Sequence, residues 1–370
     1  MTATKGLEGI VAATSSISSI HDGVLAYRGI NIDELAERAS FEEAAYLLWY
    51  GKLPTKGQLA ILQQQLSDYA AIPESLVAQM KLFPSDSNTM AVLRTAVSAL
   101  ALYDENANDN SRESNQTKAI KLQAQLPTII AAFARIRKGE EPIAPLKNVS
   151  LAHNFLYMLS GEEPDPIAVK ALDQALVLHA DHELNASTFS ARVTIATLSD
   201  IYSGITAAIA TLKGPLHGGA NEAVMKMLTE IGSLDNVEPY ILNKMANREK
   251  IMGFGHRVYK NGDPRAKHLQ KLSRGLGLLK GDSTLYEMSV RIEELVTSQK
   301  GLKPNVDFYS ASVYTLLGIP SDLFTPIFAI SRLSGWTAHI LEQLDDNRII
   351  RPRAEYTGLT NQKYIPIDLR

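Results

Sequence analysis

The sequence predicts an all-α protein of two domains, with one small β-hairpin near its N-terminus. Apolar residues recur at intervals of three and four over most of the 370-residue chain, which is typical of helices that bury one face. Strand-like alternation is nearly absent and is confined to residues 10–27, which turn at His21-Asp22-Gly23. The chain is long enough for two domains of ordinary size.

The first predicted helices begin at capping sequences. Ser40 and Glu43 fit a capping box that opens a helix ending near residue 50, and Thr55 and Gln58 repeat it for a helix ending near residue 70. The apolar periodicity predicts further helices near residues 90–100, 164–181, 186–212, 219–231, 237–247, 284–299, 308–317 and 323–344.

Polar and proline-containing stretches predict the breaks between helices. Residues 104–116 are expected to form a loop and residues 139–145 a linker, and Pro127 is expected to kink or restart the helix between them. Residues 186–212 are apolar on nearly all faces. This pattern predicts burial, either at a domain centre or at a subunit interface.

The composition excludes several classes of protein. The 37 basic and 40 acidic residues are mixed along the chain, so no basic stripe suited to nucleic acid is present. The chain has no cysteine, and no apolar run approaches the length of a membrane span. The N-terminal residues lack the apolar segment of a secretion signal. We therefore expect a cytoplasmic protein that binds neither nucleic acid nor membrane.

Three titratable residues stand beside glycines or at the start of a predicted helix, where active-site groups are often found. His217 lies in Gly-Pro-Leu-His-Gly-Gly, His256 in Gly-Phe-Gly-His-Arg and Asp307 in Asn-Val-Asp-Phe-Tyr. The helix dipole disfavours an imidazolium at a helix N-terminus, so His217 is expected to stay neutral and to donate a hydrogen bond. The alternatives are a structural histidine at 217 and an ordinary helix cap at 307.

The segment His179-Ala-Asp-His182-Glu183 places two imidazoles three residues apart. Such a pair could bind zinc if a third ligand came from elsewhere. The chain offers no cysteine and no second pair of this kind, so a histidine that binds substrate without metal is favoured. No metal site is predicted.

Several basic residues are candidates for binding an anion. Arg332 lies on a strongly apolar helix, so it needs an anionic partner from the protein or from a ligand. Lys260 and Arg265 suit a phosphate and a carboxylate, respectively. Arg351 belongs either to a solvated tail or to an arm that reaches a neighbouring subunit. The glycines of residues 250–255 do not form a dinucleotide fingerprint, but their backbone could cradle an adenine or a phosphate.

Seven segments resemble the citrate synthase family in sequence and in order. They are His179-Ala-Asp-His-Glu, Gly-Pro-Leu-His217-Gly-Gly-Ala-Asn-Glu, Gly-Phe-Gly-His256-Arg-Val-Tyr, Asp263-Pro-Arg265, Asn-Val-Asp307-Phe-Tyr-Ser, Ser-Arg332-Leu-Ser-Gly-Trp and Arg351-Pro-Arg. The chain is similar to the shorter, dimeric members, which lack the N-terminal extension of the NADH-regulated enzymes. The resemblance implies a helical homodimer with a large domain of residues 1–216 and 312–370 and a small domain of residues 217–311.

The resemblance also implies a reaction and the residues that carry it. In the family, acetyl-CoA condenses with oxaloacetate, and the citryl-CoA intermediate is hydrolysed to citrate and free CoA. By resemblance, Asp307 removes a methyl proton of acetyl-CoA, His217 donates a hydrogen bond to the thioester oxygen, and His256 polarises the ketone of oxaloacetate. The implied oxaloacetate ligands are His182, Arg265, Arg332 and Arg351 of the partner subunit, and the implied CoA ligands are Lys250, Ile251, Met252, Gly253, Phe254 and Lys260. No cofactor is implied beyond the substrate acetyl-CoA.

Three other functions remain as alternatives. A 2-methylcitrate synthase uses the same scaffold with propionyl-CoA, and one extra methylene changes binding by only about 1–3 kcal/mol. A zinc hydrolase centred on His179, His182 and Glu183 belongs to another class. A helical binding protein that has lost catalysis is disfavoured by the intact set of histidines, aspartate and arginines.

Overall fold

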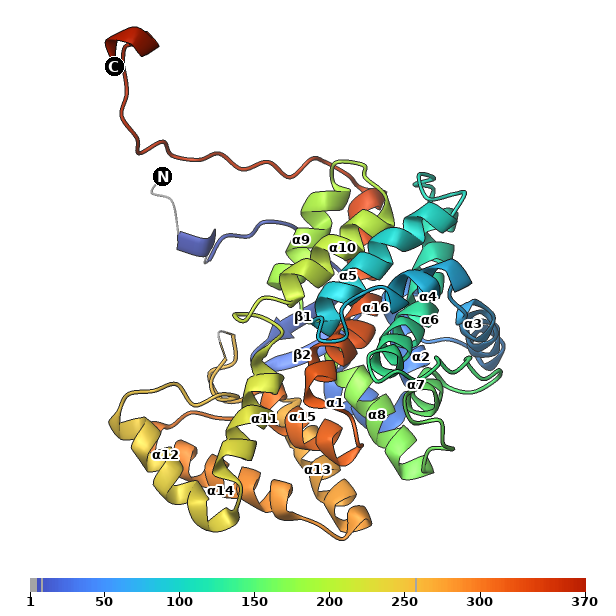
Figure 1. Ribbon diagram of the computed structural model, residues 1–370, viewed down its shortest axis with the longest axis vertical. Coiled ribbons are helices and arrows are strands. Elements are labelled where there is room, and N and C mark those ends of the chain that lie inside the picture. Colours follow the sequence, from blue (N-terminus) through green and yellow to red (C-terminus); the bar gives the residue numbers. More distant parts are fainter. Residues whose placement is uncertain (1–4, 8, 257) are drawn as a thin grey trace.

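The computed structural model in Figure 1 describes residues 5–7, 9–256 and 258–370. These residues form sixteen α-helices and three short strands, which confirms the predicted all-α class with a small N-terminal sheet. The helices are α1 (Ile32–Arg38), α2 (Phe41–Tyr50), α3 (Lys56–Tyr69), α4 (Glu74–Lys81), α5 (Thr89–Leu100), α6 (Arg112–Ile136), α7 (Leu151–Ser160), α8 (Pro166–His179), α9 (Ala186–Ile195), α10 (Ile201–Leu212), α11 (Ala220–Ile231), α12 (Val237–Ala246), α13 (Ala266–Lys280), α14 (Thr284–Lys300), α15 (Val306–Leu316) and α16 (Phe324–Asp345).

The N-terminal sheet contains one strand more than predicted. Strand β1 (Ser18–His21) pairs antiparallel with β2 (Val24–Tyr27), and β2 pairs antiparallel with β3 (Ile30–Asn31). The chain turns between β1 and β2 at Asp22 and Gly23, which both have positive φ. Glycine adopts this conformation without strain and aspartate tolerates it, so the turn forms where the sequence predicted it.

The predicted capping boxes explain where α2 and α3 begin. The Ser40 hydroxyl accepts a hydrogen bond from the backbone N–H of Glu43, and the Glu43 carboxylate accepts one from the N–H of Ser40. Thr55 and Gln58 make the same pair of bonds at α3. Each box satisfies backbone donors that a helix start would otherwise leave without partners.

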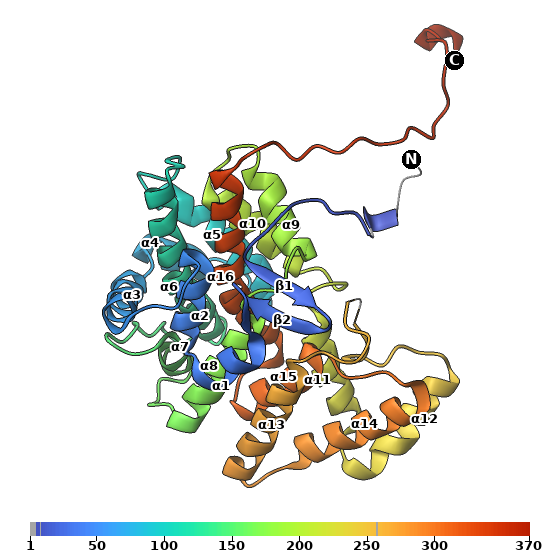
Figure 2. The same ribbon diagram turned by 180° about the vertical axis from the view of Figure 1, so that it is seen from behind.

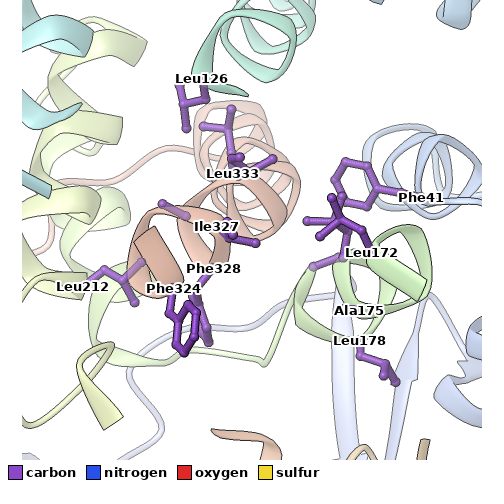
Figure 3. Close-up of a cluster of buried hydrophobic side chains, with 14 of the residues drawn as sticks. Phe41, Leu126, Leu172, Ala175, Leu178, Leu212, Phe324, Ile327, Phe328 and Leu333 are labelled. Atoms are coloured by element: carbon purple, nitrogen blue, oxygen red, sulfur yellow. The ribbon is translucent and has the colours of Figure 1, made fainter. Parts of the chain in front are cut away.

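Helix α16 forms the centre of the larger part of the molecule (Figure 1). Nearly all of its side chains are buried, and it packs against α2, α5, α6, α8, α9 and α10. Figure 3 shows apolar side chains of α2, α6, α8 and α10 around it. A helix that is apolar on all sides is stable only in a core, so α16 gives rigid support to any polar residue that it carries.

Helices α11 to α14 gather with α15 at one end of the molecule, beside the body built around α16 (Figures 1 and 2). Helices α11 and α13 pack against α15, and α12 packs against α14. Residue 311 lies inside α15, so the domain boundary expected there falls within a helix that also contacts α8 of the body.

The prediction of one helical segment over residues 186–212 is wrong at its middle. Helix α9 ends at Ile195, Leu198 adopts a positive φ of 64°, and α10 begins after Asp200. The Asp200 carboxylate accepts a hydrogen bond from the N–H of Ser203, so this residue acts as a helix cap. An aspartate inside an apolar run was the signal for the break.

The loop predicted for residues 104–116 ends earlier than expected. Helix α6 begins at Arg112, because Ser111 caps it through the N–H of Ser114. Helix α6 then continues without interruption past Pro127 to Ile136, so the restart predicted there is not observed. Residues 139–145 contain no helix or strand, as a linker requires.

The chain leaves the body at both ends (Figures 1 and 2). Residues 351–370, which follow α16, form an extended tail in which every residue is exposed. Among the described residues, each helix is too short or too polar to span a bilayer.

Candidate active site

A cleft of about 470 Å³ brings together residues that are far apart in the sequence. Its walls come from the loop after α8, the loop before α11, His256 with the segment 258–265, the start of α15 and the middle of α16. Six of the predicted site residues line it: His182, His217, His256, Arg265, Asp307 and Arg332.

Asp307 stands in the first turn of α15. The helix cap is Asn305, whose Oδ1 accepts a hydrogen bond from the N–H of Asp307 at 3.0 Å, so the alternative that Asp307 itself caps the helix is wrong. Burial raises the pKa of the Asp307 carboxyl to about 7, and the charge of Arg265 opposes this rise. A carboxyl that titrates near neutral pH is suited to act as a general base.

His256 is held in one tautomer by the backbone. Its Nδ1 accepts hydrogen bonds from the N–H groups of Val258 at 3.0 Å and Tyr259 at 3.3 Å. Burial, together with the charge of Arg265, lowers the pKa of His256 to about 4, so the ring is neutral at pH 7. A neutral ring that accepts at Nδ1 carries its proton on Nε2, where it is available to a ligand in the cleft.

His217 lies just before α11 and contacts the body through Ser187. Its Nε2 is 2.8 Å from the Ser187 hydroxyl, which also accepts a hydrogen bond from the indole N–H of Trp336 at 3.1 Å. Burial lowers the pKa of His217 to about 4, and the charge of Arg332 contributes in the same direction. The ring is therefore neutral, as predicted from the helix dipole, but the main physical cause is burial.

The Ser187 hydroxyl has one proton and two acceptors within reach. One is His217 Nε2, and the other is Asn185 Oδ1 at 2.7 Å, which also accepts from the N–H of Thr188. When Ser187 donates to His217, the imidazole proton lies on Nδ1 and is available to a ligand. The Asn185 oxygen still accepts a hydrogen bond from the N–H of Thr188 in this arrangement. The protein can therefore hold His217 as a neutral imidazole that donates from Nδ1.

Arg332 retains donors for a ligand. It is buried, its Nε donates to the backbone carbonyl of His179 at 2.8 Å, and its guanidinium lies 4.7 Å from the centre of the Phe328 ring. Burial lowers the pKa of Arg332 to about 10, and the charge of Asp181 opposes this. In the described part of the chain no carboxylate forms an ion pair with Arg332. A dicarboxylate in the cleft would supply the missing partner.

Arg265 has a partner in its own chain. Its Nε and one terminal nitrogen donate to the two oxygens of Asp263 at 2.9 and 2.8 Å. The Asp263 carboxylate also accepts from the backbone N–H of Val306 at 3.1 Å. One buried carboxylate therefore fixes Arg265 and the start of the helix that carries Asp307, while Arg265 still lines the cleft.

His182 is the remaining imidazole of the cleft. Its Nε2 lies 3.0 Å from the Tyr259 hydroxyl, and its ring is edge-on to that of His256 at 5.2 Å. Burial, followed by the charges of Arg265 and Arg332, lowers the pKa of His182 well below its ordinary value. The three cleft imidazoles are therefore neutral, and the positive charge of the cleft comes from the two arginines.

The zinc alternative finds little support in the geometry. The Nδ1 of His179 is bonded to the Ala175 carbonyl of its own helix, and the Glu183 carboxylate accepts from the N–H of Ile20. No group of three or more metal-ligating side chains suited to a metal ion occurs among residues 5–7, 9–256 and 258–370.

The predicted CoA residues lie beside the cleft and do not line it. Ile251, Gly253 and Phe254 are buried, whereas Lys250 and Lys260 are exposed. Gly253 has a positive φ of 81°, and a Cβ there would lie 2.8 Å from the side chain of Phe308, so only glycine fits. The segment is thus packed against α15, next to Asp307.

Arg351 is exposed in the C-terminal tail and does not reach the cleft of its own chain. This position leaves the predicted role across a subunit interface untested.

Two residues that the sequence did not single out as functional, Ser187 and Asn305, orient the groups that were singled out. Asn305 Nδ2 donates to the carbonyl of Gly255 at 3.0 Å and so joins the His256 loop to α15. Its place two residues before Asp307 was the available signal.

Comparison with known proteins places this chain in a family of helical acyltransferases. Residues 6–353 match the family model described as citrate synthase, C-terminal domain. The chain is 63% identical to citrate synthase 2 of Bacillus subtilis, with 100% of both chains covered, and 49% identical to the citrate synthase of Haloferax volcanii, with 99% and 98% covered. The chain therefore belongs to the citrate synthase family, and it is an enzyme.

A solved structure shows the same fold. The citrate synthase of Thermoplasma acidophilum, in a ternary complex with carboxymethyl coenzyme A and oxaloacetate, matches with a TM-score of 0.93 at 34% identity, covering 100% of both chains. The family also contains enzymes named for a different product, because 2-methylcitrate synthase 1 of Corynebacterium glutamicum is 41% identical over 99% of this chain.

Proposed function

We propose that the cleft condenses acetyl-CoA with oxaloacetate and hydrolyses the citryl-CoA product to citrate and free CoA, with Asp307, His217 and His256 as the catalytic residues. The observation that carries this assignment is the meeting of one carboxylate of raised pKa with neutral imidazoles and two arginines in a single cleft. Sequence relatives named citrate synthase, up to 63% identical over the whole chain, support the reaction.

The first step removes a proton from the methyl group of acetyl-CoA. The Asp307 carboxylate takes the proton, and the negative charge develops on the thioester oxygen. A thioester α-proton is weakly acidic, so a donor already in place must stabilise this charge. His217 supplies that donor from Nδ1 when Ser187 donates to its Nε2.

The second step forms the carbon–carbon bond. The enol carbon attacks the ketone carbon of oxaloacetate, and the ketone oxygen becomes the hydroxyl of the citryl thioester. His256 donates from Nε2 to this oxygen, since its Nδ1 already accepts two backbone N–H groups. Water then attacks the thioester carbonyl, and the carbon–sulfur bond breaks to release CoA.

Oxaloacetate binding is assigned to His182, Arg265 and Arg332, together with Arg351 of the partner subunit. Arg332 offers donors without a carboxylate partner, and the fork of a guanidinium matches a carboxylate in bidentate fashion. The buried setting strengthens such pairs, because little water competes for the donors. The dicarboxylate would bring the carboxylate partner that Arg332 lacks within the described part of the chain.

CoA binding is assigned to residues 250–254 and, more weakly, to Lys260. These residues lie on the edge of the cleft near Asp307, and their glycine backbone is packed closely against α15.

Residues 217–311 would act as a small domain that closes on the rest of the chain. Closure would exclude water until the citryl thioester has formed. The cytoplasmic setting stays a prediction.

We further infer a homodimer. Helix α10 carries no charged side chain, yet Ala210 on it is exposed, and the C-terminal tail exposes Tyr356, Leu359, Tyr364 and Ile365. Apolar surface of this kind is typical of subunit interfaces. Arg351 stands at the start of this tail and is exposed.

Mixing two inactive variants tests this arrangement. Arg351→Ala and Asp307→Asn chains are each expected to be nearly inactive, and subunit exchange between them creates one complete site per heterodimer. Recovery of activity after mixing supports the shared site. Exchange verified by differently tagged subunits, without any recovery, would exclude it.

The reaction is tested by release of free thiol from acetyl-CoA in the presence and absence of oxaloacetate. We expect release only when both substrates are present. Thiol release that does not depend on oxaloacetate would identify a thioesterase and reject the proposal.

A second candidate is 2-methylcitrate synthase, because relatives with this name reach 41–42% identity over nearly the whole chain. Comparing kcat/KM for acetyl-CoA and propionyl-CoA separates the two. We expect acetyl-CoA to be preferred by about 10-fold or more, in the range that one methylene allows. A preference for propionyl-CoA would assign the chain to the other branch.

A further inference from the structure

The loop that carries His182 is attached to the N-terminal sheet on both sides of this histidine. The Ser18 hydroxyl of β1 donates to the carboxylate of Asp181 and accepts from the backbone N–H of Glu183 at 2.9 Å. The backbone N–H of Ile20 donates to the Glu183 carboxylate at 2.7 Å. A single serine therefore joins the residue before His182 to the residue after it.

Strand β2 holds the same loop from a second direction. The buried Tyr27 hydroxyl accepts from the backbone N–H of Asp181 at 3.2 Å and lies 3.1 Å from the carbonyl of Val177 at the end of α8. These bonds fix the backbone at the point where α8 ends and the His182 loop begins. Since Tyr27 is fully buried, no water replaces them.

The backbone next to His182 is in a conformation that needs such support. Glu183 has a positive φ of 49°, which is unfavourable for a residue with a side chain. A conformation of this kind persists only where the surroundings fix it. At Glu183 the fixing contacts include the two hydrogen bonds to β1.

Asp181 also connects the loop to α16. Its carboxylate accepts from Nε2 of His339 at 3.2 Å, and His339 Nδ1 accepts from Arg192 at 3.2 Å. The carboxylate is packed so tightly that a Cβ on Gly335 would lie 2.3 Å from its free oxygen. Gly335 is less than one helical turn from Arg332, so the loop and this arginine are held in fixed relation.

We propose that Ser18 and Tyr27 are positioning residues for His182, acting through the two acids that flank it. The inference rests on the proposed role of His182 in binding oxaloacetate. The N-terminal sheet then contributes to the site, because it aims the His182 ring into the cleft, where the ring meets Tyr259 and His256. Neither Ser18 nor Tyr27 lines the cleft, so both act at a distance from the substrate.

Ser18→Ala is the sharpest test, because it removes both loop bonds and keeps the Asp181 charge that acts on Arg332. Its matched control is Ser19→Ala, an exposed neighbour on the same strand whose side chain has no hydrogen bond in the described structure. We expect KM for oxaloacetate to rise about tenfold in Ser18→Ala, the effect of losing one or two hydrogen bonds. KM for acetyl-CoA and kcat should change less than about twofold, and Ser19→Ala should match the wild type.

Tyr27→Phe provides a second variant that keeps the bulk of the core. It should raise KM for oxaloacetate in the same way, and combining it with Ser18→Ala should raise KM less than the product of the two single effects, because both act on one loop. Lower thermal stability with an unchanged KM in both single variants would show that the sheet has only a structural role.

His182→Asn separates failure of this inference from failure of the proposed function. Wild-type protein without oxaloacetate-dependent thiol release would reject the function itself. An active wild type whose KM for oxaloacetate rises in His182→Asn, but not in Ser18→Ala or Tyr27→Phe, would overturn only the positioning role. An unchanged KM in His182→Asn would remove the basis of the inference.

Discussion

The two walls of the cleft are built in different ways. On one wall, His182, His217 and Arg332 are fixed to the body through the N-terminal sheet, through Ser187 and through the buried helix α16. On the other wall, the supports are short loops, and polar side chains tie these loops together.

The loop wall carries His256, Arg265 and Asp307. Asp263 joins Arg265 to the start of α15, and Asn305 joins the His256 loop to the same helix start. Each wall is therefore held together by its own hydrogen bonds, and the contact of His182 Nε2 with the Tyr259 hydroxyl at 3.0 Å joins one wall to the other.

The largest expected effect comes from removing the proposed base, Asp307, on the loop wall. Asp307→Asn keeps the shape of the side chain and cannot take a proton, so turnover should fall on the order of 10² to 10⁴-fold. KM for oxaloacetate should stay within a few-fold, because the arginines are unchanged. Steady-state kinetics with thiol detection gives both values, and near-wild-type turnover would show that the proton is removed elsewhere.

The opposite pattern, a change in substrate affinity and not in turnover, is expected when Arg332 is removed from the wall that it shares with His182 and His217. Arg332→Gln is expected to raise KM for oxaloacetate about a hundredfold, or ~3 kcal/mol, as for the loss of a buried charged hydrogen bond. KM for acetyl-CoA should change little. Arg274→Gln, on the exposed face of α13, is the control and should have no effect. Equal losses of affinity for both substrates would contradict the division of roles between the walls.

A smaller effect is expected at Ser187, whose hydroxyl lies 2.8 Å from His217 Nε2 and sets the His217 tautomer when it donates there. Ser187→Ala leaves the ring free to carry its proton on either nitrogen, so kcat should fall about tenfold, the effect of one hydrogen bond. Ser190→Ala lies on the same helix without contact to His217 and serves as the control. An unchanged kcat in Ser187→Ala would mean that the tautomer is set by the substrate.

The smallest effect concerns stability. The raised pKa of Asp307 means that the folded protein keeps a proton that the unfolded chain has already released between about pH 4 and pH 7. The free energy of unfolding therefore falls as pH rises through this window. Asp307→Asn removes this fall in the free energy of unfolding. Its Tm at pH 8 should therefore exceed that of the wild type by about 2 °C or more, with no difference near pH 4.

Calorimetry at the two pH values measures this change, and Asp235→Asn, an exposed aspartate, provides the baseline. A lower Tm at pH 8 in Asp307→Asn would show that the carboxylate stabilises the fold and is not held under strain for catalysis.

Local signals in the sequence predicted much of the fold. The capping boxes at Ser40 and Thr55 and the turn at Asp22-Gly23 lie where short-range chemistry places them. The break between α9 and α10 and the early start of α6 were missed, although Asp200 and Ser111 are residue types that often cap helices, because the composition of the segments around them was given more weight.

The site residues likewise divide into those that the sequence reveals and those that it does not. The residues with distinctive chemistry, such as His217 and Asp307, stand out in the sequence. Their supports do not, because Ser187 and Tyr27 reach the site from distant segments and have no local pattern. The partners of a buried hydrogen bond are set by tertiary structure, so sequence spacing alone does not reveal them.

The pH dependence of kcat tests most directly whether a carboxylate works with two neutral imidazoles. The pKa of Asp307 is about 7 and those of His217 and His256 are about 4, so only the aspartate titrates near neutrality. We predict that kcat rises with pH through about 7 as Asp307 ionises, and that it does not decline between pH 7 and 8. A kcat that falls as pH rises from 6 to 8 would show that a protonated histidine is the essential acid, and would contradict this mechanism.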